Sequence, residues 1–356
     1  MEDYKKENSV SLSPLRIALL YIGVLMGAGF ASGKEIWQFF GVFGGKGIFG
    51  IIIISVIFIT LGFIIVSIGK ALDTGDLSKI IVPFNNQLVE NIIGGVVASF
   101  IFLGYFSMLA AGGAIAQEQL GIHRAIGSFI LMVLVALTTI KGFSRVSARL
   151  GKVVPVLLIT TLILVFFIIT QYYKNISTEQ VVTASPLAPN WFISAIIFGS
   201  YNLMVAIPIL GSCAVYSETE KIAKRGALLG GIFLGTCALL LYFTTLTDPK
   251  MAEASPLPML SLSLKISPVV QTIYSGVLLI AVFGTATSCF YGFCTKLPDG
   301  RKKNYFIWIS AILGFGLSLL GFSNIVAFLY PIEGYISILI LLLMLWNYIR
   351  IKCRNR

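Results

Sequence analysis

The chain has 356 residues, of which 57% are hydrophobic and only 12% are charged, and its mean hydropathy is +0.93. A soluble globular protein carries about 25% charged residues, so this composition excludes the soluble class and predicts a membrane protein. The net charge of +11 raises nucleic-acid binding as an alternative, and the placement of the basic residues argues against it.

Ten apolar segments follow one another along the chain, and each is close to the ~20 residues that a helix needs to cross a bilayer. They cover residues 16–41, 46–70, 91–118, 124–140, 152–173, 190–213, 226–247, 268–294, 304–321 and 325–349. We therefore predict an all-α integral membrane protein with ten transmembrane helices, folded as a single domain over residues 1–356.

The basic residues are distributed unevenly between alternate loops. If the N-terminus is cytoplasmic, 20 of the 26 Lys and Arg residues fall on the cytoplasmic side and five in outer loops. Such an excess is the positive-inside signal of membrane topology. It predicts a multi-pass protein of the cell membrane with both termini in the cytoplasm, with the lipid bilayer and not nucleic acid as its surroundings.

The first segment contains an unusual stretch, Gly27-Ala-Gly-Phe-Ala-Ser-Gly-Lys-Glu35, between an apolar run and an aromatic one. A charged side chain at mid-depth costs roughly 2.5–3.5 kcal/mol on insertion scales, and glycine costs about 1 kcal/mol in helix propensity. Unwound backbone is tolerated in a bilayer only where it lines a cavity or is buried in protein. We therefore predict a broken helix over residues 25–35, at a binding site.

The next elements carry fewer signals. The loop 73–90 is amphipathic and predicts a short helix on the cytoplasmic surface. In the third segment, Tyr105 offers a hydroxyl near mid-membrane and is a candidate ligand for a substrate, although small residues nearby are typical of helix packing. The five cysteines show no metal-type spacing, and we expect free thiols.

The sixth segment is interrupted at mid-depth by Phe198-Gly-Ser-Tyr-Asn202, with Pro208 beyond. This pattern predicts a second discontinuous helix, and a proline kink with packed polar residues is the alternative. Each interruption lies in the first segment of a five-segment half, at about 16–173 and 190–350. Paired interruptions at corresponding positions indicate the binding site of a transporter. The sixth segment comes five segments after the first and therefore crosses the membrane in the opposite direction, which predicts a 5+5 inverted repeat.

Three features of the second half complete the pattern. The outer loop 248–267 is apolar enough to form a lid-like hairpin. The eighth segment ends in Phe283-Gly-Thr-Ala-Thr-Ser288, whose hydroxyls either bond their own helix or bind a hard cation. Glu333 is the carboxylate of the last segment, at a depth similar to that of Lys34. We predict a Lys34–Glu333 ion pair as an extracellular gate beside Glu35, with a static ion pair as the alternative.

Ten segments, two glycine-broken helices and the Thr-Ser pair resemble the LeuT-type inverted-repeat transporters of the amino acid–polyamine–organocation superfamily. Within it, the stretch from Gly27 to Ile36 is most similar to the YkvI-type bacterial membrane proteins. The resemblance implies a secondary active transporter, a symporter that takes up an amino acid or a related small amine by alternating access.

The resemblance also implies roles for individual residues. The carboxylate of a small zwitterionic substrate would bind the amides of Gly27, Ala28 and Gly29, assisted by half-helix dipoles. The rest of the substrate would meet Phe30, Tyr105, Phe198, Gly199, Ser200, Tyr201 and Asn202.

A sodium ion is the coupling ion that the resemblance favours, and no other cofactor is expected. Its ligands would come from Leu25, Ala28, Gly284, Thr287 and Ser288. In proton-coupled relatives a lysine of the fifth segment occupies this cation site. Lys152 lies only at the entrance of that segment, which favours Na⁺ and leaves proton coupling as the alternative.

Other classes of function fit the sequence less well. A ligand-sensing receptor on the same fold is the main alternative, although the cytoplasmic loops are short. An enzyme is not expected, because the chain has one histidine and neither a His-Glu-x-x-His motif nor a nucleophile elbow. A channel would need polar stripes along several segments, whereas the polar residues gather at the two interruptions.

Overall fold

The computed structural model describes residues 12–82, 87–141, 153–180, 184–297 and 302–354, which are helical with short connections and contain no β-strand. Much of the basic loops 142–152 and 298–301 thus lies outside the described residues. In the first half, the helices are α1 (Pro14–Leu25), α2 (Ala28–Ala31), α3 (Lys34–Phe39), η2 (Gly41–Lys46), α4 (Gly47–Ala71), α5 (Leu77–Ile81), α6 (Gln87–Leu120), α7 (Arg124–Lys141), α9 (Val153–Tyr172) and η3 (Tyr173–Asn175). In the second half, they are α10 (Trp191–Val215), α11 (Glu220–Thr245), α12 (Pro249–Ala254), α13 (Pro258–Leu264), α14 (Pro268–Cys294), α15 (Lys303–Ser318), α16 (Phe322–Asn324), η4 (Ile325–Leu329) and α17 (Tyr330–Arg354).

Seven helical stretches of the described residues are long and apolar enough to cross a membrane. They are Gly41–Ala71, Gln87–Leu120, Pro155–Asn175, Trp191–Val215, Glu220–Thr245, Pro268–Cys294 and Phe322–Cys353. Two shorter apolar helices, Pro14–Leu25 and Arg124–Ile140, join them. Large apolar side chains such as Phe166 and Leu339 are more than 60% exposed, as expected where lipid is the solvent. All ten predicted segments contain helix, while the number that cross the membrane and the repeat remain predictions.

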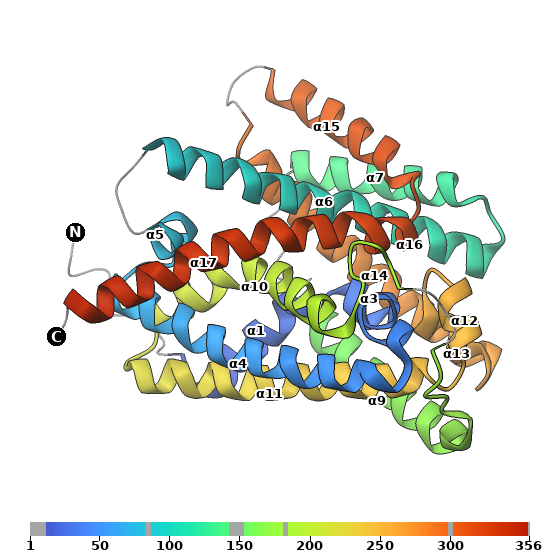
Figure 1. The fold of residues 1–356 in the computed structure, drawn as a ribbon. Helices are drawn as coiled ribbons and strands as arrows, with labels where there is room; N and C mark the ends of the chain where they lie inside the picture. The colour runs from blue at the N-terminus through green and yellow to red at the C-terminus, as the bar shows by residue number, and fades with distance from the viewer. Residues whose placement is uncertain (1–11, 83–86, 142–152, 181–183, 298–301, 355–356) are drawn as a thin grey trace.

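The long helices form two groups (Figure 1). One group packs α1, α4, α10 and α11 together, and the other packs α6, α7, α14 and α15. α17 lies along α10, while α2, the short helix inside the first segment, contacts both α6 and α14. The interrupted segment therefore lies between the two groups.

The break predicted in the first segment is confirmed. α1 ends at Leu25, α2 begins at Ala28 and α3 at Lys34, so the chain leaves the helical path twice. At the second break Gly33 has a φ of 79°, in the left-handed region where a side chain would be strained. The glycines of this stretch thus interrupt the helix, as their low helix propensity predicts.

The polar backbone groups exposed by these breaks find partners on other helices. The hydroxyl of Tyr274 donates to the carbonyl of Ala31 at 2.8 Å, and the amide of Met259 donates to the carbonyl of Ser32 at 2.9 Å. An unpaired backbone group in a bilayer is costly, so these bonds stabilise an unwound segment that lipid alone could not tolerate.

The discontinuous helix predicted for the sixth segment is wrong, because α10 runs unbroken from Trp191 to Val215. The polar side chains bond back to their own helix: Ser200 donates to the carbonyl of Ile196 at 2.7 Å, and Asn202 to that of Phe198 at 2.9 Å. A Cβ at Gly199 would lie 2.9 Å from the side chain of Ile57. This glycine therefore allows α10 to approach α4 closely and does not unwind the helix.

The short helix predicted in the loop 73–90 exists as α5, and its apolar face is buried against other helices while Lys79 is exposed. Ile80 and Ile81 are fully buried, and α5 packs against α10 and α17. The side-chain amide of Asn347 donates to the carbonyls of Lys79 and Ile80 at 3.1 and 2.9 Å. These bonds satisfy carbonyls near the helix C-terminus, so they hold the buried face of α5 against α17.

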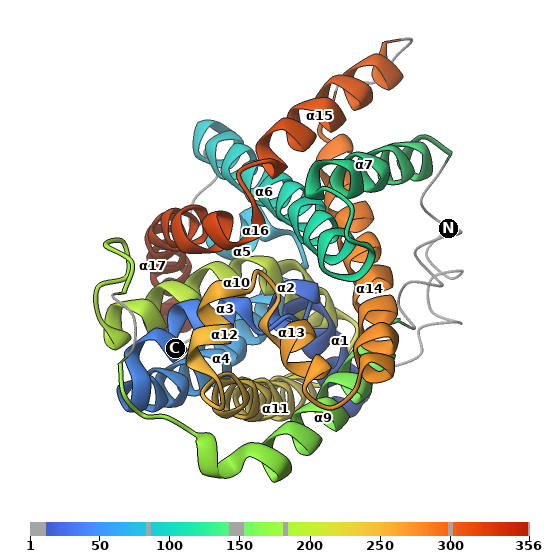
Figure 2. The same cartoon turned by 90° about the vertical axis from the view of Figure 1, so that its right-hand side faces the viewer.

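The predicted hairpin in the outer loop forms from α12 and α13, each of which begins with a proline at its first position. Figure 2 shows α12 and α13 lying over α2 and α3 at one end of the molecule. α17 ends at the opposite end (Figure 1). The hairpin therefore covers the broken first helix from one side.

Candidate functional site

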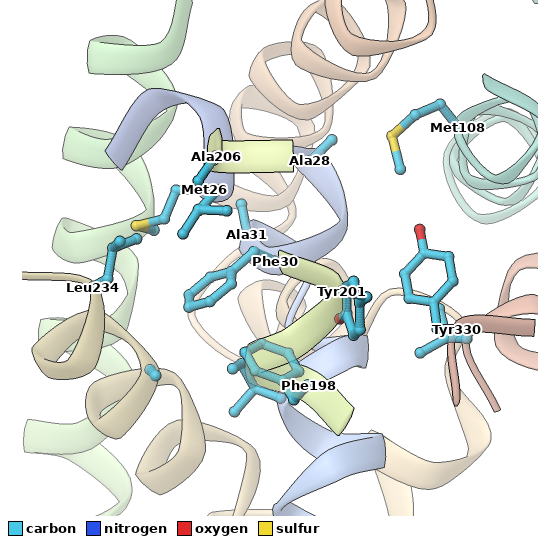
Figure 3. Packing of buried hydrophobic residues seen from close by; sticks show 14 of the residues in the cluster. Met26, Ala28, Phe30, Ala31, Met108, Phe198, Tyr201, Ala206, Leu234 and Tyr330 are labelled. Carbon is cyan, nitrogen blue, oxygen red and sulfur yellow. The ribbon is translucent and has the colours of Figure 1, made fainter. Parts of the chain in front are cut away.

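A cavity of about 140 Å³ lies at the break of the first helix, enclosed by residues of α1, α2, α3, α6, α10, α14 and α17. Nine residues singled out from the sequence line it: Leu25, Gly27, Ala28, Gly29, Phe30, Glu35, Tyr201, Asn202 and Glu333. Figure 3 shows how Ala28, Phe30, Tyr201, Tyr330 and Met108, which come from four helices, lie in this region. The structure thus brings together residues that are far apart in the sequence.

Tyr105 does not line the cavity, contrary to its prediction as a ligand. Its ring stacks on Phe290 at a centroid distance of 4.3 Å, and its hydroxyl donates to the carbonyl of Ala311 at 3.4 Å. A Cβ at Gly314 would collide with the Tyr105 ring. Tyr105 therefore packs α6 against α14 and α15, on the face of α6 that is turned away from the cavity.

Phe198, Gly199 and Ser200 also lie outside the cavity wall. The ring of Phe198 contacts those of Phe40 at 5.1 Å and Phe39 at 5.4 Å, in an aromatic cluster that includes Phe30 and Tyr201 (Figure 3). This cluster anchors α3 on α10. Its function is to hold the broken segment in place beside the site.

The hydroxyls predicted to bind sodium are bonded to their own helix. Thr287 donates to the carbonyl of Phe283 at 2.7 Å and Ser288 to that of Gly284 at 2.9 Å, and none of these residues lines the cavity. Thr285 lines it instead, beside Gly27. Thr285 and Thr287 are two residues apart on the helix, so their side chains point in directions about 200° apart. Only one of the two threonines can therefore face the break.

Lys34 does not pair with Glu333, so the predicted ion pair is not formed in this structure. Its ammonium donates to the carbonyls of Glu253 at 2.9 Å and Ala252 at 3.3 Å, at the end of α12. The indole of Trp37 donates to the Glu253 carboxylate at 2.6 Å. Since Lys34 and Glu35 are neighbours on a helix, they point in different directions, one to the hairpin and the other to the cavity.

Glu35 is 6% exposed and is held at the cavity wall by two contacts. The hydroxyl of Tyr201 donates to its Oε2 at 2.7 Å. Its Oε1 lies so close to Gly29 that a Cβ on that glycine would collide with it. The absence of a side chain at Gly29 is therefore what lets the carboxylate reach the break.

Glu333 is also 6% exposed, and no hydrogen bond reaches its carboxyl group from any part of the chain that the structure describes. It lies one turn after Tyr330, which begins α17 directly after the π-helical η4. Pro331 has no amide hydrogen to donate, and the carbonyl of Ala327 accepts a hydrogen bond from the hydroxyl of Ser185 at 3.1 Å. This local irregularity accompanies the turn that carries both residues to the cavity.

Ten of the lining residues are not among the predicted site residues, and four of these bring a polar or sulfur-containing side chain: Met108, Thr285, Cys289 and Tyr330. Their spacing carries a weak signal, because Tyr330 and Glu333, like Thr285 and Cys289, lie on one helical face. The hydroxyls of Tyr330 and Ser107 are 3.0 Å apart, and the rings of Tyr330 and Tyr201 are 5.2 Å apart.

The cavity holds two carboxyl groups, while its lining includes no Lys, Arg or His from the described residues. Within this same part of the chain, no group of three or more His, Cys, Asp or Glu could hold a metal ion. Two carboxyl groups thus share a cavity whose described lining contains no cationic side chain.

No protein-family model matches the chain. It is 29% identical over 329 residues to the uncharacterized membrane protein YkvI of Bacillus subtilis (strain 168), covering 92% of this chain and 93% of the relative. It is 25% identical over 333 residues to the uncharacterized protein YyaD of the same strain, covering 92% and 94%. The similarity to YkvI agrees with the multi-pass membrane character of the fold.

Solved transporters share this fold. The inward-facing structure of Mhp1 matches with a TM-score of 0.56 at 13% identity, over 93% of this chain and 74% of that one. A closed form of Mhp1, described as a nucleobase-cation-symport-1 family transporter with bromovinylhydantoin bound, matches with a TM-score of 0.53 at 11% identity, over 86% and 71%. A mutant of the Eremococcus coleocola manganese transporter matches with a TM-score of 0.54 at 12% identity, over 86% and 69%.

Proposed function

We propose that this chain is a secondary active transporter that moves a small solute with an amino group, an amino acid or a related amine, across the cell membrane by alternating access. The observation that carries the proposal is the cavity at the break of the first helix, between two groups of helices that could move relative to each other. Binding at an interrupted helix near mid-membrane is the arrangement by which such folds transport solutes.

The two sides of the cavity support a gating role for the hairpin. On one side, α12 and α13 are bonded to the broken helix through Lys34 and through the amide of Met259, which reaches Ser32. Away from the hairpin along α10, Val205 lines the cavity and is 47% exposed. We propose that this structure is closed at the hairpin and open towards the opposite side, the cytoplasm in the predicted topology, and that the Lys34 bonds break when the outer gate opens.

The coupling ion is proposed to be Na⁺, bound near the break by the carbonyls of Leu25 and Ala28 and by hydroxyls of α14. The position of Thr285 beside Gly27 supports a ligand from α14. Proton coupling is the second candidate, and the observation that favours it is the pair of buried carboxyl groups of Glu35 and Glu333. A titratable group inside a membrane protein is often part of an ion or proton pathway.

Counterflow in liposomes tests transport without requiring a known coupling ion. Purified full-length protein is reconstituted, the lumen is loaded with an unlabelled amine or amino acid, and uptake of the same labelled compound is followed. Transient accumulation above empty liposomes is expected for at least one compound. Binding of a compound without counterflow would favour the receptor alternative. Replacing Na⁺ by choline, and separately changing the pH, then distinguishes sodium from proton coupling.

A matched pair of glycine variants controls for loss of folding. In Gly29→Ala, the new methyl group takes the space of the Glu35 carboxylate, so counterflow should be lost. In Gly95→Ala, the new Cβ meets nothing within 4 Å, so counterflow should be retained. Equal counterflow by the two variants would mean that this cavity is not the transport site.

A further inference from the structure

We propose that the solute is a small protonated amine without a carboxylate of its own, bound between Glu35 and Glu333. This inference rests on the proposed function, because it names the chemical class of the solute that the same cavity would carry. It narrows the choice between an amino acid and an amine that the sequence and the fold leave open.

The position of Glu35 argues against a substrate carboxylate at the break. The resemblance to amino acid transporters would have the backbone at Gly27 to Gly29 receive the carboxylate of a zwitterion. In this structure Oε1 of Glu35 already lies against Gly29, and Tyr201 holds the other oxygen at 2.7 Å. A second carboxylate there would meet like charge in a poorly solvated space. The protein thus places its own carboxylate where an amino acid would bring one.

Glu333 has no positively charged partner among the residues that the structure describes. Glu333 is 6% exposed and lines the cavity, and its carboxyl group has no hydrogen-bond donor among the described residues. Lys34 is the cation nearest in sequence to Glu35, and its ammonium donates hydrogen bonds to carbonyls of α12. A buried carboxylate is stable only when it is protonated or paired with a positive charge. An ammonium group in the cavity would provide that charge for both Glu35 and Glu333.

The size and the walls of the cavity fit the same class. Its volume of about 140 Å³ accommodates a small organic solute such as a short alkylamine. Aromatic side chains, Phe30, Tyr201 and Tyr330, stand beside the carboxyl groups. Aromatic ring faces attract a cation, and their edges pack against a short alkyl chain.

A set of matched compounds tests the charge requirement. Butylamine is norvaline without its carboxylate, and butan-1-ol is a neutral compound of the same length. Binding of each to the purified full chain at neutral pH is measured by calorimetry and by thermal shift. We expect butylamine to bind at least about tenfold more tightly than either of the others. Norvaline binding as tightly as butylamine, or stabilisation by manganese chloride but not by butylamine, would overturn the proposal.

Carboxyl variants identify the residue that pairs with the amine. Glu333→Gln should weaken butylamine binding about tenfold or more, because the neutral amide cannot balance an ammonium. Glu90→Gln is the matched control, since Glu90 is a half-buried carboxyl on α6 outside the cavity lining. Unchanged butylamine affinity in Glu333→Gln, at a melting temperature close to that of the wild type, would refute the pairing.

A measurement on the wild type locates the site without a mutation. Cys289 lines the cavity, whereas Cys353 is exposed near the C-terminus. Butylamine should slow alkylation of Cys289 by a small thiol reagent and leave Cys353 unaffected, as followed by peptide mass spectrometry. Stabilisation by butylamine without protection of Cys289 would place the amine elsewhere and overturn the proposal.

The two proposals fail in different ways. If norvaline binds and shows counterflow while butylamine does neither, the chain is a transporter and the inferred solute class is wrong. If butylamine binds as described but shows no counterflow, the inferred amine site is supported and the proposed transport function is wrong.

Discussion

Glu35 connects the break in the first helix to α10 through a single hydrogen bond, from the hydroxyl of Tyr201 at 2.7 Å. That bond keeps one carboxylate oxygen occupied and aims the group at Gly29. Neighbouring residues of the same short helix do different work, because Lys34 reaches the hairpin and Glu35 reaches the cavity. The site therefore depends on side-chain direction within one helical turn.

Removing the Tyr201 hydroxyl tests this arrangement. Hydrogen bonds to charged groups contribute about 1.5–3 kcal/mol, so Tyr201→Phe should weaken binding of a cavity ligand such as butylamine by about tenfold or more. Tyr105→Phe loses a hydroxyl outside the cavity and should bind as the wild type does. Calorimetric titration of both variants decides the matter, and a similar loss in both would exclude a specific function for Tyr201.

Among the elements, the α12–α13 hairpin is fastened at several points to the segment it covers. Lys34 donates to two carbonyls of α12, Trp37 donates to Glu253, and Met259 donates to Ser32. Lys34 is only 2% exposed, so its ammonium has exchanged water for these carbonyl oxygens. Loss of the ammonium should leave the carbonyls of α12 without their donor.

We expect Lys34→Met to loosen the hairpin while leaving the long helices intact. Hydrogen exchange of amides 249–264, measured by mass spectrometry, should be faster than in the wild type. Lys250→Met is the control, because it removes another cation from the same hairpin. Lys250 makes no such bonds to the first segment within the described residues, so this variant should exchange as the wild type does. Unchanged exchange in Lys34→Met would show that the other bonds suffice to hold the hairpin.

The hairpin should also respond to acid through Asp248, which pairs with Lys265 at 2.6 Å and caps α12 at the amide of Met251. Burial alone would raise the pKa of Asp248, but the hydrogen bonds from Lys265 and Met251 hold it below the usual value. A lowered folded pKa means that the pair stabilises the fold fully above about pH 4 and loses this effect as the pH falls through the folded pKa.

Hydrogen exchange of the hairpin, corrected for the intrinsic effect of pH, should therefore be constant between about pH 7 and pH 5 and increase below about pH 4. Asp248→Asn keeps an acceptor for the amide of Met251 but cannot pair with Lys265. Its hairpin should show no such pH dependence. A variant with the wild-type profile would mean that another group titrates.

At the scale of the whole molecule, the two groups of helices explain why one cavity can collect residues from both halves of the chain. Each group combines two consecutive segments from the first half with two from the second. The broken helix lies between the groups, and the cavity lies at its break. The fold as a whole is similar to those of solved transporters, at TM-scores of 0.53–0.56.

The predicted orientation in the membrane can be checked with single cysteines. The first variant keeps Cys353 and lacks the other four native cysteines. The second variant lacks all five native cysteines and carries Lys250→Cys on α12. In intact cells, a membrane-impermeant maleimide should label residue 250 and should reach Cys353 only after permeabilisation, because the basic loops stay on the cytoplasmic side. The reverse pattern would invert the topology.

The sequence by itself determined the membrane class and the broken first helix. Composition is a property of the chain alone, and three glycines with two adjacent charges have a local cost that a continuous helix in lipid could not meet. Gly27 to Phe30 were predicted from this cost as binding residues, and they line the cavity. Glu35 and Glu333 were predicted as gate residues because they are charged groups within the membrane, and they line it as well.

Only the tertiary structure decided which side chains face that cavity. Gly199 looks in sequence like the glycines of the first segment, yet it serves close packing against Ile57 in an unbroken helix. Thr287 and Thr285 are equivalent by composition, and the rotation of α14 selects Thr285. Lys34 found its acceptors on a hairpin 218 and 219 residues away. Glycine permits both unwinding and close approach, and polar side chains can bond their own helix or a distant one, so the packing partner determines the outcome.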